Sequence, residues 1–396
     1  MTPTDHHSIA TSSFDALSAA RGLIPNVLAA RDECERLRHV PPLLVETLAK
    51  SGLLQMFLPR SMGGPELAPL DAFDAIEEIS KADGSIGWCT MIASVLAAFT
   101  GWLPTDVGRA MGGEPTDLRL GGSIRPQGRA RLVNGGYRVD GQWDFASGIH
   151  HARWVVCPCV VMDGNQPVLT HTGVPKTRIM WLPAERITII DTWDVVGLRG
   201  TGSHDFVVND EFVPATYTSS LADPPQERGP LYIPRLFLTW VWTATVANAL
   251  GIARGAMDAF VAMASVKAST SSPTLLRDRP LVQTRAAEAE AILSAARAYV
   301  RSTVEQTWCL VTAGNQDLDI AITQARLSIT HAMHEAARSV DLVFHAAGTN
   351  AVYTRNPIER YFRDSHVTLQ HGAALPVHME AAGKALMGLR PSDPGW

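Results

Sequence analysis

Three separated stretches of this sequence carry side chains that suit a planar, charged ligand. Trp143–Gly148 contains two aromatic rings and the hydroxyl of Ser147. Gly197–Ser203 places three glycines around Arg199, and Arg360–His371 combines two arginines with a histidine at its end. An aromatic ring offers a flat apolar wall, a guanidinium stabilises negative charge, and an imidazole exchanges protons near neutral pH. We therefore expect the three stretches to form one active site.

The first stretch has the chemistry that a flavin requires. A flavin ring needs a flat wall and hydrogen-bond partners for its N5 atom and its pyrimidine edge. Trp143 and Phe145 are candidates for the wall, and Ser147 is a candidate partner of N5. The alternative interpretation is ordinary barrel core, because a Trp/Phe strand that ends in a Ser-Gly turn is also common there. Both interpretations are open at this point.

The glycine-rich stretch predicts a loop that supports a ligand. Glycines allow backbone N–H groups to approach a ligand closely, and the guanidinium of Arg199 would stabilise a reduced flavin or a phosphate. Thr201 and Ser203 add two hydroxyl groups. The stretch is not a dinucleotide-binding fingerprint, because no strand-to-helix crossover follows it. The alternative is a β-turn with an exposed arginine.

The elements that must position these stretches fall into three regions. Residues 15–118 carry apolar side chains at three- and four-residue steps, which predicts helices. From about residue 119 to 216, short apolar runs alternate with turn signals such as Asn134-Gly135, which predicts a β-meander or small barrel. After a Pro-rich segment at 223–234, long helical patterns predict an antiparallel four-helix bundle. The expected domains are 1–118, 119–222 and 223–396, which is an α+β fold.

Length, composition and charge exclude several classes of protein. The 396 residues are 46% hydrophobic and 18% charged, which is enough apolar material for two or three domains. The formal net charge is −5 and no polybasic run occurs, so we expect no nucleic-acid partner. An odd count of five cysteines and no apolar block in the first twenty residues favour a cytoplasmic protein.

Two further features have unremarkable interpretations. The apolar stretch Leu236–Ala253 is interrupted by threonines, so it is expected to be a buried bundle helix rather than a membrane span. The pairs His150/His151 and His331/His334 lack accompanying ligands at a recognised spacing, so we assign no metal site.

Five stretches, in this order and spacing, resemble the acyl-CoA dehydrogenase superfamily. They are Ala82–Trp88, Pro126–Ala130 with Asn134–Tyr137, Trp143–Gly148, Gly197–Ser203 with Phe212–Pro214, and Arg360–Asp364 followed by His371. The chain is most similar to the reduced-flavin-dependent, two-component monooxygenase branch, which includes 4-hydroxyphenylacetate hydroxylase oxygenase components and dibenzothiophene monooxygenases. The resemblance implies an N-terminal helical domain, a central β-barrel and a C-terminal four-helix bundle.

The resemblance also implies a cofactor, partners and residue roles. The cofactor would be reduced FMN or FAD, delivered by a separate flavin reductase and used with O₂ on a small-molecule substrate. Ser147 would contact flavin N5, Ser123 would donate to the pyrimidine edge, and His371 would act as acid or base. The alternatives are a simple Gly-rich turn at Ser123 and a histidine at a helix N-terminus that makes a structural hydrogen bond at His371. A homotetramer is expected, in which Lys267, Gln283 or the Ala347–Asn350 loop reaches a neighbour's cofactor.

Two departures from the family patterns direct the choice of reaction. Phenol-hydroxylating members carry a histidine eight residues after the tryptophan of the Gly-Trp motif, and Leu96 stands there in this chain. The pocket wall formed by Trp88, Leu96 and Phe99 is therefore expected to be apolar. Near His371, the glutamate that serves as base in acyl-CoA dehydrogenases is absent from the sequence.

We therefore expect the oxygenase component of a two-component flavin-dependent monooxygenase. Its substrate would be a small aromatic or heteroaromatic compound, or an amine or sulfur centre, that needs no deprotonation. One alternative keeps the fold and oxidises an acyl-CoA thioester with FAD. Another is a flavin-less scaffold of the same fold without catalytic activity.

Overall fold

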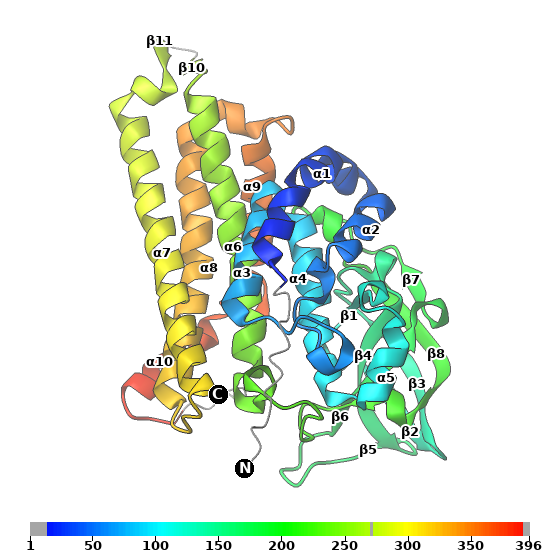
Figure 1. The fold of residues 1–396 in the computed structure, drawn as a ribbon. Helices are drawn as coiled ribbons and strands as arrows, with labels where there is room; N and C mark the ends of the chain where they lie inside the picture. The colour runs from blue at the N-terminus through cyan, green and yellow to red at the C-terminus, as the bar shows by residue number, and fades with distance from the viewer. Residues whose placement is uncertain (1–13, 270–271, 391–396) are drawn as a thin grey trace, which may run out of the picture.

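The computed structural model describes residues 14–269 and 272–390, and their elements follow the order helices, strands, helices (Figure 1). The predicted α+β class with this order is confirmed. Most of the first twenty residues, used in the argument against a secretory signal, lie outside the described residues.

In the described part of the N-terminal region, five α-helices are joined by shorter 3-10 turns. They are α1 (Ala16–Leu37), α2 (Pro42–Lys50), α3 (Pro69–Ala82), α4 (Gly84–Phe99) and α5 (Thr105–Gly112). The side chains of Asp15 and Asp83 cap α1 and α4 by accepting hydrogen bonds from backbone N–H groups of the first turn. Helix α4 is buried on almost every side and contacts elements of all three regions, including β1, α6 and α9. It is therefore the element around which a shared site can form.

The central region is one mixed sheet of nine strands. They are β1 (Leu120–Gly122), β2 (Gly128–Val133), β3 (Gly136–Trp143), β4 (Trp154–Asp163), β5 (Gln166–Pro167), β6 (Thr177–Pro183), β7 (Thr188–Ile190), β8 (Asp205–Pro214) and β9 (Thr218–Ser219). The main path is β7-β8-β3-β2-β4-β6-β9, and β1 and β5 pair with β4. A pure meander does not describe it, because β4 runs parallel to both β1 and β2. Strands β6 and β8 are not neighbours but share one apolar core, so the sheet curls around that core.

The C-terminal region is a helical bundle. Its helices are α6 (Pro234–Ala264), α7 (Pro280–Thr312), α8 (Asp319–Ala347), α9 (Pro357–Thr368) and α10 (Pro376–Leu386), and a hairpin of β10 (Ala268–Ser269) and β11 (Ser272–Leu275) links α6 to α7. Helices α6, α7 and α8 are long and pack side by side, whereas α9 and α10 are short and both pack against α8 (Figure 1). The short 3-10 turn η12 (Gly372–Ala374) between them begins directly after His371.

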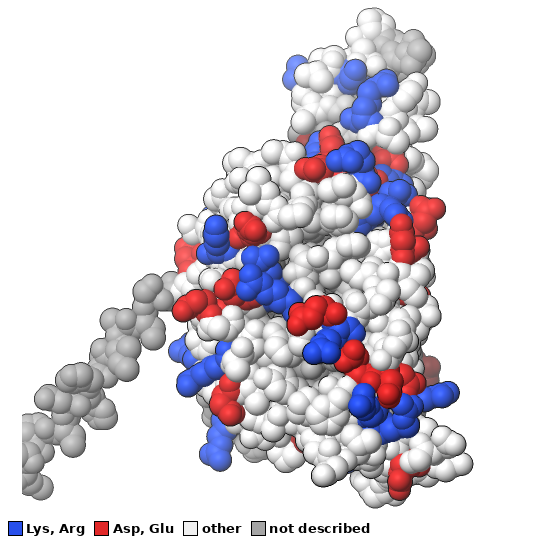
Figure 2. Space-filling view, turned by 90° about the vertical axis from the view of Figure 1, so that its right-hand side faces the viewer, with Lys and Arg blue, Asp and Glu red and all other residues white. Residues whose placement is uncertain are grey.

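Among the described residues, two helical segments, Gly84–Trp102 and α6, are long and apolar enough to cross a membrane. Their apolar windows are 94% and 89% buried inside the protein, as expected of core helices. The surface has a different character. On the face shown in Figure 2, which is the right-hand side of Figure 1, basic and acidic side chains are interspersed.

Candidate active site

The indole of Trp88 joins the helical, sheet and bundle regions. Trp88 lies on the second turn of α4, and its Nε1 donates a 3.1 Å hydrogen bond to Oγ of Ser147. The same indole and the imidazole of His371 form a T-shaped pair, with 5.4 Å between ring centroids and 79° between ring planes. Two of the three predicted stretches therefore meet at a residue of the N-terminal region.

The third stretch reaches this junction through its hydroxyl groups. Oγ of Ser203 lies 2.7 Å from Oγ of Ser147 and 2.8 Å from Oγ1 of Thr201. Thr201 in turn donates to the backbone oxygen of Leu198 at 2.8 Å. All three hydroxyl residues are buried. We call Trp88, Ser147, Ser203, Thr201 and the Leu198 carbonyl the hydroxyl chain.

The backbone after β3 turns sharply to bring Ser147 to this position. The strand ends at Trp143, and Phe145 adopts a left-handed φ of 54°. The turn is then held by two backbone hydrogen bonds across to the glycine-rich loop, from the Ala146 N–H to His204 and from the Gly148 N–H to Thr201. The position of the Ser147 hydroxyl is therefore set by backbone contacts on both sides.

The two aromatic residues predicted as the flavin wall have different environments. Trp143 is fully buried in the sheet core, where its indole stacks on Phe206 with ring centroids 5.0 Å apart and donates to the Pro158 oxygen at 2.7 Å. Its ring has no free face for a cofactor, so this assignment is corrected. Phe145 is 57% exposed and touches Trp193 edge-on at 5.8 Å. It is the aromatic ring of the pair that a ligand can reach.

Ser123 lies beside Ser147. The residue before it, Gly122, forms an isolated antiparallel bridge with Ser147. Ser123 is buried, its N–H donates to the Val156 oxygen at 3.2 Å, and its Oγ accepts from the Arg125 N–H at 3.2 Å. The structure thus brings the two predicted serine partners of the flavin to neighbouring backbone positions.

The glycines of the 197–203 loop pack against helices rather than opening a ligand cradle. A Cβ on Gly197 would lie 2.4 Å from the Arg363 oxygen in α9, and one on Gly200 would lie 2.3 Å from Sγ of Cys34 in α1. Such distances exclude any side chain at both positions. The glycines therefore allow close packing of the loop, which differs from the backbone approach to a ligand expected from the sequence.

Arg199 also differs from its expected role. Its guanidinium donates to the Val195 oxygen at 2.9 Å and lies 3.7 Å from carboxylate oxygens of Glu35 and Asp194. Its charge is offset by these two acids and it belongs to the ionic surroundings of α1 and α9. It does not join the hydroxyl chain.

Helix α9 holds the loop from the other side. The Arg363 guanidinium donates to the Val196 oxygen at 2.5 Å, and Oδ1 of the buried Asp364 accepts from the Leu198 N–H at 2.6 Å. Burial raises the pKa of Asp364 to about 8. Sequence reasoning included Asp364 in a motif but gave it no role, because burial of a carboxylate cannot be read from local sequence.

His371 is held in a neutral, oriented state. Its Nδ1 accepts a hydrogen bond from the Ala373 N–H at 3.2 Å, so the ring proton of the neutral form resides on Nε2. Burial lowers the pKa of His371 to about 4. This differs from the expectation that the imidazole titrates near neutral pH. In this environment His371 is a neutral hydrogen-bond donor at pH 7.

The predicted apolar pocket residues all lie on α4. Leu96 and Phe99 are buried, and Phe99 packs edge-on against Phe237 at 4.8 Å between centroids. Phe237 also lines an apolar cavity of about 10 Å³ together with Val95. A cavity of this size holds no more than one water-sized molecule.

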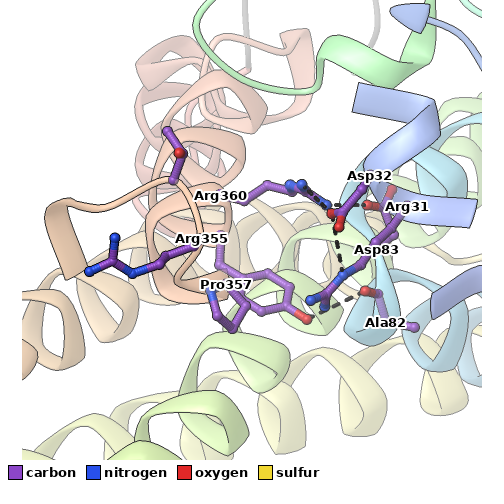
Figure 3. A pocket seen from close by; sticks show the side chains of 9 residues that line it. Arg31, Asp32, Ala82, Asp83, Arg355, Pro357 and Arg360 are labelled. Atoms are coloured by element: carbon purple, nitrogen blue, oxygen red, sulfur yellow. Dashed lines mark hydrogen bonds and ion pairs between the residues drawn. The ribbon is translucent and has the colours of Figure 1, made fainter. Parts of the chain in front are cut away.

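A second cavity, of about 60 Å³, lies between α1, the junction of α3 and α4, and the start of α9, and it is polar (Figure 3). Arg360 lies at its centre, with Nη2 2.8 Å from Asp32, Nε 3.7 Å from Glu35 and Nη1 3.8 Å from Asp83. Tyr361 donates to the Lys81 oxygen at 2.7 Å. These groups satisfy one another, so we assign the cavity a structural role.

Asp83 is the second residue whose importance was missed. It caps α4 and is buried against Arg360, and burial raises its pKa to about 6. A signal was available in this case, because an aspartate directly before a Gly-Ser-Ile run is typical of a helix N-cap.

Lys267, Gln283 and the Ala347–Asn350 loop, predicted to reach a neighbour's cofactor, lie at one end of the bundle. They follow the end of α6, the start of α7 and the end of α8, which meet near the β10–β11 hairpin (Figure 1). Gln283 donates to the Arg277 oxygen at 2.9 Å.

Two domain families match the chain. Acyl-CoA dehydrogenase, N-terminal domain, matches residues 16–102, and acyl-CoA dehydrogenase, C-terminal domain, matches residues 243–376. The first range contains Trp88 and the second contains His371. The fold and the junction therefore define a protein of the acyl-CoA dehydrogenase type.

Individual relatives narrow the class. The chain is 32% identical over 369 residues to indole-3-acetate monooxygenase from Acinetobacter baumannii, with 93% of this chain and 92% of that protein covered. It is 27% identical over 379 residues to the oxygenase component of FADH(2)-dependent resorcinol hydroxylase from Rhizobium sp. (strain MTP-10005), with 91% and 90% covered. The crystal structure of 3-HSA hydroxylase from Rhodococcus sp. RHA1 has a TM-score of 0.86 and 28% identity, with 98% of this chain and 100% of that chain covered.

The chain belongs to the flavin-dependent monooxygenase branch of the acyl-CoA dehydrogenase superfamily. This membership confirms the predictions of the family, of a flavin-dependent monooxygenase and of reduced flavin as the cofactor.

Proposed function

We propose that this monooxygenase inserts one oxygen atom of O₂ into a small aromatic or heteroaromatic substrate at the junction around Trp88. The observation that carries the proposal is the contact of one indole with both Ser147 and His371. These two side chains come from the sheet and the bundle, and they are the candidate catalytic residues. Their meeting gives one site a hydroxyl, a neutral imidazole and an apolar wall.

The residues present fit a flavin. Phe145 offers an exposed aromatic face, Ser147 a hydroxyl partner for N5, and Ser123 a neighbouring hydroxyl for the pyrimidine edge. Reduced flavin, when bound, supplies the electrons that activate O₂. The protein's own contribution is to orient the ring, through backbone-fixed serines, and to keep water away from it.

His371 would act as a hydrogen-bond donor through Nε2. Its Nδ1 is already occupied by the Ala373 N–H, which fixes the tautomer and points the Nε2 proton away from η12. A pKa lowered to about 4 makes the ring a weak base at neutral pH. Removal of an α-proton from an acyl thioester needs a strong base, so this environment favours oxygenation over acyl-CoA oxidation.

The substrate would be an aromatic ring that reacts without losing a proton to a protein base. Leu96 follows Trp88 along α4 and is buried among apolar side chains. The similarity to indole-3-acetate monooxygenase makes an indole the first substrate to test. An amine or sulfur centre would satisfy the same apolar wall.

The partners follow from the oxygenase-component class. A separate flavin reductase would deliver the reduced flavin, and the protein would act in the cytoplasm as a homotetramer. The five free cysteines, four of them buried, suit a reducing compartment. Light scattering of the purified chain tests the tetramer, and a dimer or monomer would contradict it.

The decisive experiment follows the oxygen atom. Photoreduced FMN or FAD is mixed with the protein and indole-3-acetate under ¹⁸O₂, and products are analysed by mass spectrometry. We expect a product that carries one ¹⁸O atom. Ser147→Ala should lower the yield of this product at least about tenfold, because the variant loses one hydrogen bond to the cofactor. Absence of labelled product from indole, phenol and thiophene probes, with both flavins, would contradict the proposal.

A further inference from the structure

The hydroxyl chain has an acceptor-only group at one end. The backbone oxygen of Leu198 cannot donate, and it receives the Thr201 hydroxyl at 2.8 Å. It also receives the indole N–H of Trp193 at 3.1 Å. The Leu198 N–H is held at 2.6 Å by the buried carboxyl of Asp364, which fixes the peptide in place. This end of the chain therefore has a fixed position and a fixed polarity.

The other end of the chain has a donor-only group. The indole Nε1–H of Trp88 can only donate, and its partner at 3.1 Å is Oγ of Ser147. The donor at one end and the acceptor at the other favour the same direction of donation along the hydroxyl chain, from Trp88 towards Leu198.

One arrangement of protons satisfies every contact between these ends. Thr201 gives its only hydroxyl proton to Leu198, so the 2.8 Å contact between Thr201 and Ser203 must use the Ser203 proton. The 2.7 Å contact between Ser203 and Ser147 must then use the Ser147 proton. A reversed link would place two oxygen lone pairs against each other in a buried site, at the cost of an unmade hydrogen bond.

In this arrangement the hydroxyl proton of Ser147 is already used, and one lone pair of its oxygen remains free for a ligand. It donates to Ser203 and accepts from Trp88, so a ligand beside it can only donate to it. This bears on the oxidation state of a flavin. N5 of oxidised flavin carries a lone pair and no proton, whereas N5 of reduced flavin carries a proton that it can donate.

We propose that the hydroxyl chain selects reduced over oxidised flavin by holding Ser147 as a hydrogen-bond acceptor. The inference rests on the proposed function, in which Ser147 contacts N5. Thr201 and Ser203 act through Ser147 and are positioning residues rather than catalytic ones. The selection is thermodynamic: the oxidised ring meets lone pair against lone pair, and the reduced ring gains a hydrogen bond.

The test compares the dissociation constants of oxidised and reduced flavin, measured by anaerobic titration of the full chain with the same flavin. Thr201→Val removes one hydroxyl and keeps the shape, which frees Ser203 to donate to Ser147 and Ser147 to donate to oxidised N5. Ser203→Ala releases the Ser147 proton directly. In both variants we expect the ratio of oxidised to reduced dissociation constants to fall about tenfold, the worth of one hydrogen bond. Thr201→Ser retains the hydroxyl and should retain the wild-type ratio.

The outcomes separate this inference from the proposed function. Wild-type protein that binds neither form of flavin, or a Ser147→Ala variant that binds reduced flavin as tightly as wild type, contradicts the proposed function. Clear binding that depends on Ser147, with a ratio unchanged in both Thr201→Val and Ser203→Ala, overturns the inference alone. Equal affinity of the wild type for both forms overturns it as well. Circular dichroism of each variant shows that the fold is retained.

Discussion

Two buried polar regions meet at Leu198, and they differ in how they are stabilised. The hydroxyl chain around Ser147 is neutral, and the three contacts that link its hydroxyls to one another and to the Leu198 oxygen are 2.7–2.8 Å long. The cluster around Asp83, Arg360 and Asp364 is ionic, and its two acids have pKa values raised by burial. The first region faces the proposed cofactor, and the second connects α1, α4 and α9.

The difference has a physical reason. A neutral hydroxyl costs little to bury once it is hydrogen-bonded, and its direction is set by its neighbours. A buried charge is costly, so it needs several partners and its state depends on pH. A neutral chain can therefore keep one polarity across the physiological pH range, whereas the ionic cluster can tie helices together but responds to pH.

The strongest test of the ionic region is the removal of Asp83. Asp83→Ala takes away the cap of α4 and a partner of Arg360. We expect the free energy of unfolding to fall by about 2 kcal/mol, as for loss of a helix cap in a buried site. Urea denaturation at pH 7 measures it. Asp83→Asn keeps an acceptor for the cap, and a loss as large as that of Asp83→Ala would show that the cap is not the cause.

The next test uses pH. A carboxyl whose pKa is raised on folding binds its proton more tightly in the folded state, so stability falls as pH rises from about 4 to the folded pKa. For Asp83 the window ends near pH 6, and for Asp364 near pH 8. We expect the unfolding free energy to drop between pH 5 and 8 by about 1.4 kcal/mol for each pH unit over which one of these carboxyls loses its proton, which amounts to several kcal/mol for the two together.

Asp364→Asn is the matched variant for this pH dependence. It removes the titration and retains an oxygen for the Leu198 N–H. Its stability should depend less on pH than that of the wild type over the same range. If the unfolding free energies of the two proteins change with pH in the same way, a group other than Asp364 causes the pH dependence.

The hydroxyl chain should behave differently in the same assay. Thr201→Val removes one buried hydroxyl whose partners are Leu198 and Ser203. We expect a loss of about 1 kcal/mol in unfolding free energy, the net value of a buried hydrogen bond. The loss should be equal at pH 5 and pH 8, because the chain contains no titrating group. A loss of unfolding free energy that changes with pH would contradict this expectation and show that the two regions are energetically coupled.

The smallest effect is expected at Arg199. Its guanidinium is one-third exposed and is offset by Glu35 and Asp194. Arg199→Gln should change the affinity for reduced flavin by less than about threefold, the scale of an exposed ion pair. Fluorescence titration under anaerobic conditions measures it. A loss of tenfold or more would return Arg199 to the role first predicted from the sequence, as a group that stabilises the cofactor's negative charge.

Local pattern and family resemblance together predicted much of this protein. The order of helices, strands and helices follows from apolar periodicity and turn signals. The candidates Ser147 and His371 came from short motifs, and the structure brings both to Trp88. The prediction for Trp143, as part of the flavin wall, shows the limit of local pattern. Residues 143 and 145 would share a face of a continuous strand, but β3 ends at Trp143 and the left-handed backbone of Phe145 turns the second ring outward.

Residue types and their spacing were enough to predict the order of helices and strands, the hydroxyl, imidazole and aromatic groups available, and the absence of a glutamate base near His371 and of a histidine at position 96. Those properties are local, because they depend on residue type and spacing. The packed fold was needed to show which hydroxyl donates to which, that Asp364 holds Leu198, and that burial lowers the pKa of His371 to about 4. Hydrogen-bond direction and desolvation depend on neighbours that are distant in the chain, and packing alone brings them together.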